Sequence, residues 1–549
     1  MTATSLSEIL LPILVFSPLL GSLILAFLDK ENKRLIKLTA FGISLIPFVL
    51  SIIMMVEFVD RSAQGLFYDD PEGFVFFLDV NWLTEGNLDI NFTMAVDGIS
   101  IFLILLTTLI FPISIYFSWD VDKHPRAFFA LILLLEVGVL GFFVALDLLL
   151  FYVFFEMVLI PMYFIIGIWG GKDRVYASLK FFLYTLVGSL LMLVAIIYLG
   201  SHIDLTDPIL LDSRPDLEGV IFTTDYSLIL KYMDISLTAE AWLFAAFALS
   251  FAVKVPLFPL HTWLPDAHVQ APTAGSVILA GVLLKMGSYG LVRFCLPLFP
   301  HASIDFAPYI AILAVIGVIY GAMAAMVQTD IKKLVAYSSV SHLGFIVLGT
   351  FAMTEDAMSG AVIQMVNHGI ATGALFLMVG MIYNRRHTRE IKDFQGIATS
   401  MPRFALLFLI TVMASVGLPG LNGFVGEFII LLGSFDSTVI SSIFAILAAT
   451  GVVIAAVYLL WMFRRVMFGK LDKDENRNLQ DLSNREVAVM VPLVILMFVM
   501  GIYAKPFLGP ISKGSKVIIE QVKAAENYPS AEVETEEAEE EATVMLYRP

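Results

Sequence analysis

Apolar runs of about 20 residues recur along the chain and are separated by short polar segments. An α-helix needs a run of about that length to cross the hydrocarbon core of a bilayer. The pattern therefore predicts an all-α polytopic membrane protein with about fourteen transmembrane helices. Their expected bounds, good to a few residues, are 7–28, 35–58, 97–118, 127–146, 148–169, 176–200, 239–260, 273–295, 306–327, 332–352, 358–383, 402–432, 437–463 and 487–508.

The polar segments alternate in charge along the chain. The first, residues 29–37, holds four basic residues, whereas the second, residues 59–97, contains Asp69, Asp70 and Glu72. Basic residues also follow the third, fifth, ninth, eleventh and thirteenth spans: Lys123, Arg126, Lys172, Arg174, Lys332, Lys333, Arg385, Arg386, Arg389, Lys392, Arg464, Arg465, Lys470 and Lys473. The positive-inside rule then predicts that the odd-numbered loops are cytoplasmic and that both termini lie outside.

Composition supports a membrane protein and excludes several other classes. Of the 549 residues, 59% are hydrophobic and 15% are charged. The formal net charge of -16 owes much to eight glutamates between Glu526 and Glu541, so nucleic acid is not an expected partner and residues 520–549 are expected to form a disordered acidic tail. The single cysteine, Cys295, cannot hold a cysteine-ligated iron-sulfur cluster, and the sequence has no P-loop or Rossmann fingerprint. The first apolar run lacks a basic region before it, which favours a retained span over a signal peptide.

The seventh span is predicted to break next to a lysine. Lys254 is followed by Pro256 and Pro259, which cannot donate to the carbonyl groups of Ala252 and Val255. Freed carbonyls and a buried ammonium are tolerated at membrane depth only inside protein or beside a water-filled cavity. This combination is typical of an ion path.

A second break is predicted in the twelfth span, where an apolar run is crowded with helix-breaking residues just before Glu427. The residues at this break are Gly417, Pro419, Gly420, Gly423 and Gly426. Because the two broken spans are five apart, we expect two inverted five-helix repeats, 127–295 and 306–470. The first three spans, 1–126, would precede them, and the last span, 487–508, would follow.

Seven ionisable residues lie well inside apolar runs: Glu136, Glu156, Lys254, Lys285, His342, His368 and Glu427. Each charge at bilayer depth costs at least ~2.5 to 3.5 kcal/mol on insertion scales, so we expect these groups to face one another and not the lipid. Glu156 is the expected partner of Lys254, and Lys285 and the two histidines are expected to bridge toward Glu427. The competing interpretation is that they are structural ion pairs, histidines bonded to helix carbonyls or interhelical hydrogen bonds. For Glu136 both a shared contact with Lys254 and an interhelical hydrogen bond stay open.

Three further groups lie near these residues. His261 and Asp266 are expected to cap and hydrogen-bond the cytoplasmic mouth of the broken helix. Pro265 and a separation of seven residues between His261 and His268 argue against a metal site there. Arg293, near the outer end of the eighth span, is expected to snorkel toward water.

Several stretches resemble the antiporter-like membrane subunits of NADH-quinone oxidoreductase, respiratory complex I, and in particular chain M, also called chain 4. They include FYVFFEMVLIPMYFIIGIWGGKDRVYASLKFFLYTLVGS, VKVPLFPLHTWLPDAHVQAPTAGSVILAGVLLKMGSYGLVRF, SSVSHLGF, NHGIATGALF and GLPGLNGFVGEF. A glutamate at position 427, where related chains usually have lysine, favours chain M. We also expect no long lateral amphipathic helix after the last span. Its absence would argue against chain L.

This resemblance implies fourteen helices with discontinuous helices seven and twelve, and a proton-translocation role for Glu156, Lys254, Lys285, His342, His368 and Glu427. It also implies that FMN, iron-sulfur clusters, NADH and quinone are bound by partner subunits, that this chain holds no cofactor, and that antiporter-like chains flank it in the membrane arm. The expected location is an energy-transducing membrane, with the bacterial inner membrane favoured. Two alternatives remain open: a subunit of a multi-subunit sodium/proton antiporter, and a structural subunit whose buried charges only hold helices together.

Overall fold

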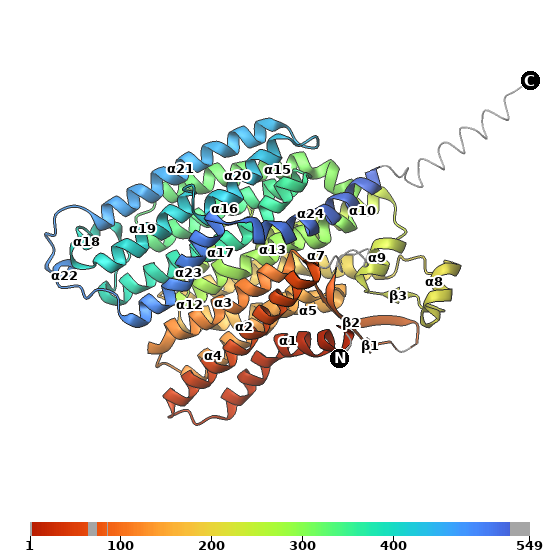
Figure 1. Ribbon diagram of the computed structural model, residues 1–549, viewed down its shortest axis with the longest axis horizontal. Coiled ribbons are helices and arrows are strands. Elements are labelled where there is room, and N and C mark those ends of the chain that lie inside the picture. The colour runs from red at the N-terminus through yellow and green to blue at the C-terminus, as the bar shows by residue number, and fades with distance from the viewer. Residues whose placement is uncertain (1–2, 64–73, 85, 527–549) are drawn as a thin grey trace, which may run out of the picture.

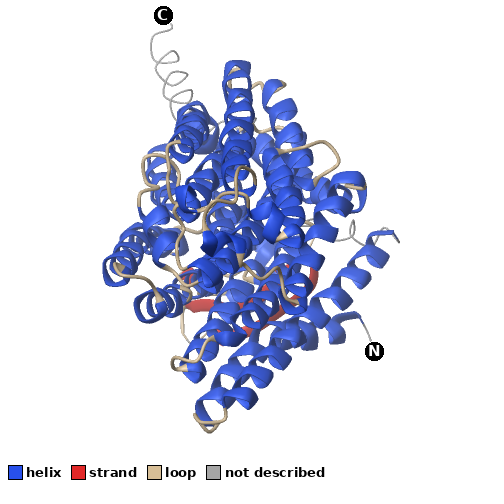
Figure 2. Cartoon of the chain, turned by 90° about the vertical axis from the view of Figure 1, so that its left-hand side faces the viewer, coloured by secondary structure: helices blue, strands red, loops and turns tan. Residues whose placement is uncertain are grey.

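The computed structural model describes residues 3–63, 74–84 and 86–526. Within these residues, 13 stretches of helix are long and apolar enough to cross a bilayer, and the shorter helices α19 and α20 together form one more span. The prediction of an all-α polytopic membrane protein is therefore confirmed (Figures 1 and 2). The 13 long stretches and the broken span agree with the expected number of about fourteen. The spans consist of α1 (Ala3–Phe27), α2 (Lys33–Ala63), α3 (Ser100–Phe117), α4 (Pro125–Val144), α5 (Leu148–Met157) with α6 (Leu159–Trp169), α7 (Arg174–Gly200), α10 (Leu237–Lys254), α12 to α14 (Thr273–Ile278, Leu284–Gly290 and Leu296–Leu298), α15 (Pro300–Met326), α16 (Ile331–Phe351), α17 (Glu355–Arg386), α19 (Pro402–Val416) with α20 (Asn422–Phe435), α21 (Ser442–Met467) and α23 (Asn484–Ile502).

The eighth, tenth and eleventh spans form the centre of the bundle. Their most apolar windows are 100%, 94% and 100% buried inside the chain, whereas those of α2 and α21 are 28% and 33% buried. The peripheral helices therefore keep one face for lipid or for partner chains, as expected for a membrane protein. Lys285, His342 and His368 lie on the three central spans, so the fold removes them from lipid.

The loops gather at two ends of the bundle, as their alternating charge predicts. At one end, which we call the basic end, Lys37 pairs with Asp122, Arg389 with Asp330 and Lys473 with Asp393. The short segments at this end are η1 (Ser118–Asp120), η5 (Ile391–Asp393), α18 (Ile397–Ser400) and α22 (Asp474–Arg477). The other end, which we call the hairpin end, carries β1 (Val75–Leu83), β2 (Leu88–Val96), β3 (Phe222–Thr223), α8 (Pro208–Ser213), η2 (Pro215–Leu217) and α9 (Tyr226–Tyr232).

A small sheet covers the hairpin end, where the sequence predicted only acidic loops. Strands β1 and β2 pair antiparallel, and β3, from the long loop after α7, adds to β2 in parallel (Figure 2). The Thr223 hydroxyl donates to Asp89 at 2.9 Å, which fixes this loop on the hairpin. Asp69, Asp70 and Glu72 lie outside the described residues.

Two buried carboxyl groups hold the same loop on the start of α5. Asp147 caps α5 by accepting from Leu149 and Leu150 at 2.9 and 2.8 Å, and its second oxygen accepts from Thr224 at 2.6 Å. Asp225 caps α9 in the same way by accepting from Ser227 and Leu228. Burial raises the pKa of Asp147 to about 7 and the pKa of Asp225 to about 6.

We expect the attachment of this loop to weaken as pH rises. Both carboxyl groups bind protons more tightly in the folded chain than in the unfolded chain, whose carboxyl pKa is about 4. Their contribution to the stability of the attached loop is therefore fully present below pH ~4 and is lost as pH rises through ~6 to 7. Amide hydrogen exchange of residues 222–232, corrected for its intrinsic pH dependence, should become faster over that window. The Asp147→Asn variant should show a smaller change, and an equal change in both proteins would contradict the assignment.

Two expectations about the carboxyl-terminal segment differ from the structure. An amphipathic helix of 22 residues, α24 (Lys505–Glu526), follows the last span, where no long amphipathic helix was expected. It includes residues 520–526, so the expected disordered tail is wrong for these residues, and its remainder, 527–549, lies outside the described residues. It packs across the outer parts of α15 and α17, and Gly98 lies against the Pro510 carbonyl. Its stripe of Ile511, Ile518, Ile519 and Val522 is buried, so packing against the bundle stabilises a segment whose mean hydropathy is low.

Candidate functional site

The seventh span breaks where the sequence predicts. Helix α10 ends at Lys254, and α11 (Trp263–Gln270) begins only after Pro256 and Pro259. One detail differs from the prediction, since the Ala252 carbonyl is not left free: it accepts from Leu257 at 2.8 Å. A bond five residues along the chain replaces the one that proline removes.

Lys254 lies at this break and is 2% exposed. Its ammonium donates to the Phe155 carbonyl at 3.4 Å and lies 4.1 Å from the centre of the Phe155 ring. The predicted direct ion pair with Glu156 is not formed, although the two charges interact through space. A backbone carbonyl and an aromatic face thus hold the ammonium at this break in place of a carboxylate.

Glu156 and Glu136 carry carboxyl oxygens without hydrogen-bond partners in the described part of the chain. Glu156, near the end of α5, is half-buried, and one oxygen is unpartnered while the carboxylate reaches the Ser189 hydroxyl. Glu136 on α4 is 0% exposed, and both of its oxygens are unpartnered. Neither alternative predicted for Glu136 is therefore seen, because it contacts neither Lys254 nor an interhelical donor.

Lys285 starts a connected row of polar groups in the bundle centre. Its ammonium lies 2.7 Å from Nδ1 of His368 and donates to the Ala280 carbonyl. Ala280 belongs to a π-helical segment, Leu279–Leu283, directly before α13. Because an ammonium can only donate, Nδ1 of His368 accepts and Nε2 is the nitrogen that carries the proton of the neutral ring.

The row continues through the second histidine to the glutamate. His342 Nδ1 lies 2.7 Å from Glu427 Oε1, and the His342 and His368 rings are 5.8 Å apart. Both rings line a cavity of about 10 Å³, and their Nε2 atoms have no hydrogen-bond partner among the described residues. A polar cavity of this size accommodates about one water molecule, which can bridge the two Nε2 atoms. The structure thus brings Lys285, His368, His342 and Glu427 together, as predicted.

The second break places Glu427 on the central helices. Helix α19 ends at Gly417, whose φ of 82° favours glycine, and α20 begins at Asn422 after Pro419 and Gly420. A side chain at Gly423 would meet the Ala414 carbonyl, so the two half-helices approach closely at the break. Both discontinuous helices are therefore confirmed.

Sequence reasoning misjudged His261, Asp266 and Arg293 near this row. His261, expected to cap the mouth, is 3% exposed, and its Nδ1 has no hydrogen-bond partner within the described chain. His268, for which only a metal site was considered and rejected, is 0% exposed, both of its ring nitrogens lack partners in the same described part, and it stacks on Phe376 at 4.4 Å. Asp266, expected to cap the mouth, pairs with Lys180 at 2.7 Å. Arg293 does not snorkel, since it is 4% exposed and forms an ion pair with Asp97. In the sequence, His268 and Arg293 stand among small and apolar neighbours, which could have indicated that both are buried. Their contacts could not be predicted because the contacting residues come from distant segments.

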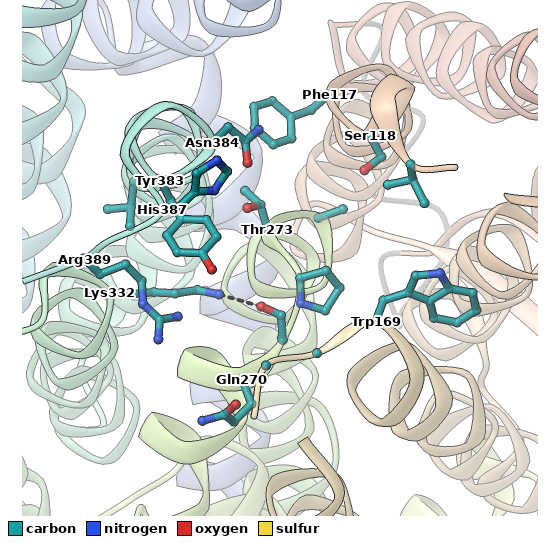
Figure 3. A pocket seen from close by; sticks show the side chains of 18 of the residues that line it. Phe117, Ser118, Trp169, Gln270, Thr273, Lys332, Tyr383, Asn384, His387 and Arg389 are labelled. Carbon is teal, nitrogen blue, oxygen red and sulfur yellow. Dashed lines mark hydrogen bonds between the residues drawn. The ribbon is translucent and has the colours of Figure 1, made fainter. Parts of the chain in front are cut away.

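A cavity of about 680 Å³ opens at the basic end between the loops and the central helices (Figure 3). Lys332 reaches into this region and donates to the Ala271 carbonyl at 2.6 Å, with Tyr383, His387 and Arg389 nearby (Figure 3). His268 lies on α11, whose last residue, Gln270, lines the cavity, and it interacts electrostatically with both Lys332 and Lys285.

Comparison with known proteins agrees with this architecture. Residues 145–455 match the family model described as NADH:quinone oxidoreductase/Mrp antiporter, TM. The chain is 43% identical to NADH-quinone oxidoreductase subunit M of Rhodobacter capsulatus, over 90% of this chain and 93% of that protein. It is 40% identical to NADH-ubiquinone oxidoreductase chain 4 of Arabidopsis thaliana, over 90% and 94%.

Solved structures show the same fold. A chain of respiratory complex I from Thermus thermophilus is 30% identical, with a TM-score of 0.80 over 93% of this chain and 99% of that chain. A chain of the Mrp complex from Dietzia sp. DQ12-45-1b shares the fold with a TM-score of 0.74 at 17% identity, over 95% of this chain and 100% of that chain. The chain therefore belongs to the NADH:quinone oxidoreductase/Mrp antiporter membrane-subunit family, in the group of the M/chain 4 subunits of NADH-quinone oxidoreductase.

Proposed function

We propose that this chain moves protons across the membrane as the M-type subunit of an NADH:quinone oxidoreductase. The observation that carries the proposal is the continuous buried row Lys285, His368, His342 and Glu427. Each of these four ionisable groups lies within hydrogen-bonding distance of the next or is separated from it by a space for one water molecule. A proton can therefore pass along the row stepwise, and the burial of the groups on central helices keeps them away from lipid.

Each step in the row has an atom that releases and an atom that accepts a proton. The Lys285 ammonium releases to Nδ1 of His368, and Nε2 of His368 releases through a bridging water to Nε2 of His342. Nδ1 of His342 then releases to Glu427 Oε1. Within one transfer each histidine takes a proton on one nitrogen and gives one from the other. This leaves both rings as the opposite tautomer, so each ring must return to its starting tautomer before the next proton passes.

The basic end supplies protons to this row. Lys332 lines the 680 Å³ cavity, and the path from there to Lys285 would pass His268, whose buried ring nitrogens have no hydrogen-bond partner among the described residues. Lys254 and Glu156 control the start of the path: when the carboxylate approaches the lysine, the charged ammonium is stabilised, and when it withdraws, the proton is released. Glu136 is buried and has two carboxyl oxygens without partners among the described residues. It can therefore receive a proton near Glu156, or the Glu156 side chain can move toward it.

The rest of the machinery lies in partner subunits. We propose that FMN, iron-sulfur clusters, NADH and quinone are bound there and that antiporter-like chains flank this one on both sides. The membrane is an energy-transducing membrane, in bacteria the inner membrane, with the basic end cytoplasmic and both termini outside. Segments 127–295 and 306–470 are proposed to be inverted repeats, which the equivalent breaks five spans apart support.

The test is NADH-driven proton uptake into vesicles that carry the complex with Lys254→Ala or Glu156→Gln, together with a native gel. We expect both variants to assemble and to lose pumping and coupled quinone reduction several-fold. Normal pumping in an assembled complex would overturn the proposed path and leave this chain as a scaffold. Failure of assembly in both variants would support the structural interpretation of these charges instead.

A further inference from the structure

Three side-chain amides that take no part in the proposed proton steps lie beside Glu427. Gln364 and Asn367 are one turn apart on α17, which also carries His368, and Asn422 is the first residue of α20. Their exposed fractions are 2%, 0% and 0%. Fully buried amides cost free energy unless hydrogen-bonded, so their contacts need an explanation.

The amides form a chain of hydrogen bonds from the helix break to the carboxylate. Asn367 Nδ2 donates to the Asn422 carbonyl at 2.8 Å, and Asn422 Nδ2 donates back to the Asn367 carbonyl at 3.3 Å. Asn367 Nδ2 also lies 3.4 Å from Gln364 Oε1, and Gln364 Nε2 donates to Glu427 Oε1 at 3.2 Å. Backbone carbonyls can only accept, which fixes the orientation of both asparagine amides.

The start of α20 depends on this contact. The residue before it, Leu421, offers no side-chain cap, so the first turn of α20 lacks the usual stabilisation at a helix start. A side chain at Gly426 would meet Gln364, which shows that α20 lies directly on α17 at this level. The reciprocal asparagine pair therefore joins the break to the helix that carries His368.

We propose that Asn367 and Asn422 are positioning residues that act through Gln364 to hold the Glu427 carboxylate against His342. Glu427 Oε1 accepts from His342 and from Gln364 together, so its place is set by α16 and α17 at once. Without the asparagine pair, the first turn of α20 is free to fray and Glu427, five residues into the helix, moves away from His342. This inference rests on the proposed function of the row.

The test compares Asn367→Leu with Asn367→Asp in the intact complex. Leucine has a similar size and no donor, so proton uptake per assembled complex should fall several-fold at every pH. A carboxyl group at 367 lacks a donor when ionised and regains one when protonated. Uptake by Asn367→Asp should therefore be low at pH ~8 and recover toward pH ~6, since burial and nearby carboxylates raise a carboxyl pKa.

The ionisable groups that face position 367 are known from the shared cavity. They are His342 on α16, His368 on α17 and Glu427 on α20, while α19 contributes Ala414 and Ser415 to the lining. The wild-type complex and Asn476→Leu, which replaces a buried asparagine at the basic end, serve as references for the pH dependence that these groups cause by themselves.

Four outcomes would overturn one of the two proposals. If Asn367→Asp follows the wild-type pH profile, or pumps as poorly as Asn367→Leu at both pH values, the positioning role is overturned. The ratio of proton uptake at pH ~6 to uptake at pH ~8 for Asn367→Asp, compared with the wild-type ratio, tests the positioning role even where Asn367→Leu does not assemble. Glu427→Gln in the same vesicles separates the two proposals: normal pumping by that variant overturns the proposed function, whereas its loss together with wild-type behaviour of both Asn367 variants overturns only the positioning role.

Discussion

Replacing Lys285 by leucine is expected to slow proton uptake by about 100-fold or more, because a proton-transfer group contributes that much to the rate of its step. Lys285 is the first member of the row, and it contacts His368 directly. No carboxylate pairs with it in the described chain, so an apolar side chain of similar volume leaves no buried charge behind and assembly should be retained. The measurement is NADH-driven proton uptake per complex assembled on a native gel.

Lys37→Leu is the matched control for this experiment. Lys37 is 7% exposed and pairs with Asp122 at the basic end, away from the row. Its loss removes a lysine of equal charge and leaves a solvated aspartate, so uptake should stay at the wild-type rate. Wild-type uptake in assembled Lys285→Leu complexes would show that protons cross this chain without the row.

The spans and their breaks could be predicted from the sequence because both follow from local chemistry. A bilayer requires an apolar run of fixed length, and proline removes a donor wherever it stands in a helix. The positions of Lys285, His342, His368 and Glu427 inside apolar runs indicated that they must meet, since isolated charges at that depth are costly. The row that they form agrees with that expectation.

The exact partners could not be predicted because they depend on the packing of distant segments. Glu156 is separated from Lys254 in this structure, and a carbonyl and a ring from Phe155 take the place expected for the carboxylate. Asn367 and Asn422 drew no attention because neutral amides carry no charge penalty in a sequence, yet their contact sets the geometry beside Glu427. Helix α24 was missed because its apolar residues are spaced for one buried face and do not form a long run.

Arg293 shows the same limitation most clearly. An arginine near the end of a span is usually explained by snorkelling, but here the segment before α3 folds inward and brings Asp97 to it. Arg293 also donates to the Tyr289 hydroxyl at 3.3 Å, and its carbonyl accepts from Tyr226 at 3.1 Å. The side chain therefore joins the eighth span to the segment before α3, and the backbone carbonyl of the same residue holds the loop after α7 at the hairpin end.

Removing one partner of this ion pair is expected to destabilise the chain by ~3 to 5 kcal/mol, because the remaining charge stays buried without a partner. Asp97→Asn is the cleaner variant, since an asparagine oxygen can still accept from Ile99 and Ser100, which Asp97 caps. The readouts are the amount of assembled complex and the temperature at which it loses activity. Arg485→Leu is the control: the Arg485–Asp120 pair is 30% and 70% exposed, so its loss should cost only about 0 to 1 kcal/mol.

The double variant Asp97→Asn with Arg293→Met decides whether charge or packing is responsible. If the cost comes from an unpaired buried charge, removing both charges should recover most of the stability, because replacing a buried pair by apolar groups is often neutral. Proton uptake per assembled complex should then be normal, since Arg293 and Asp97 lie outside the row. If the double variant is as unstable as the sum of the single variants, the packing and the Tyr289 contact of the Arg293 side chain stabilise the hairpin end and the ion pair does not.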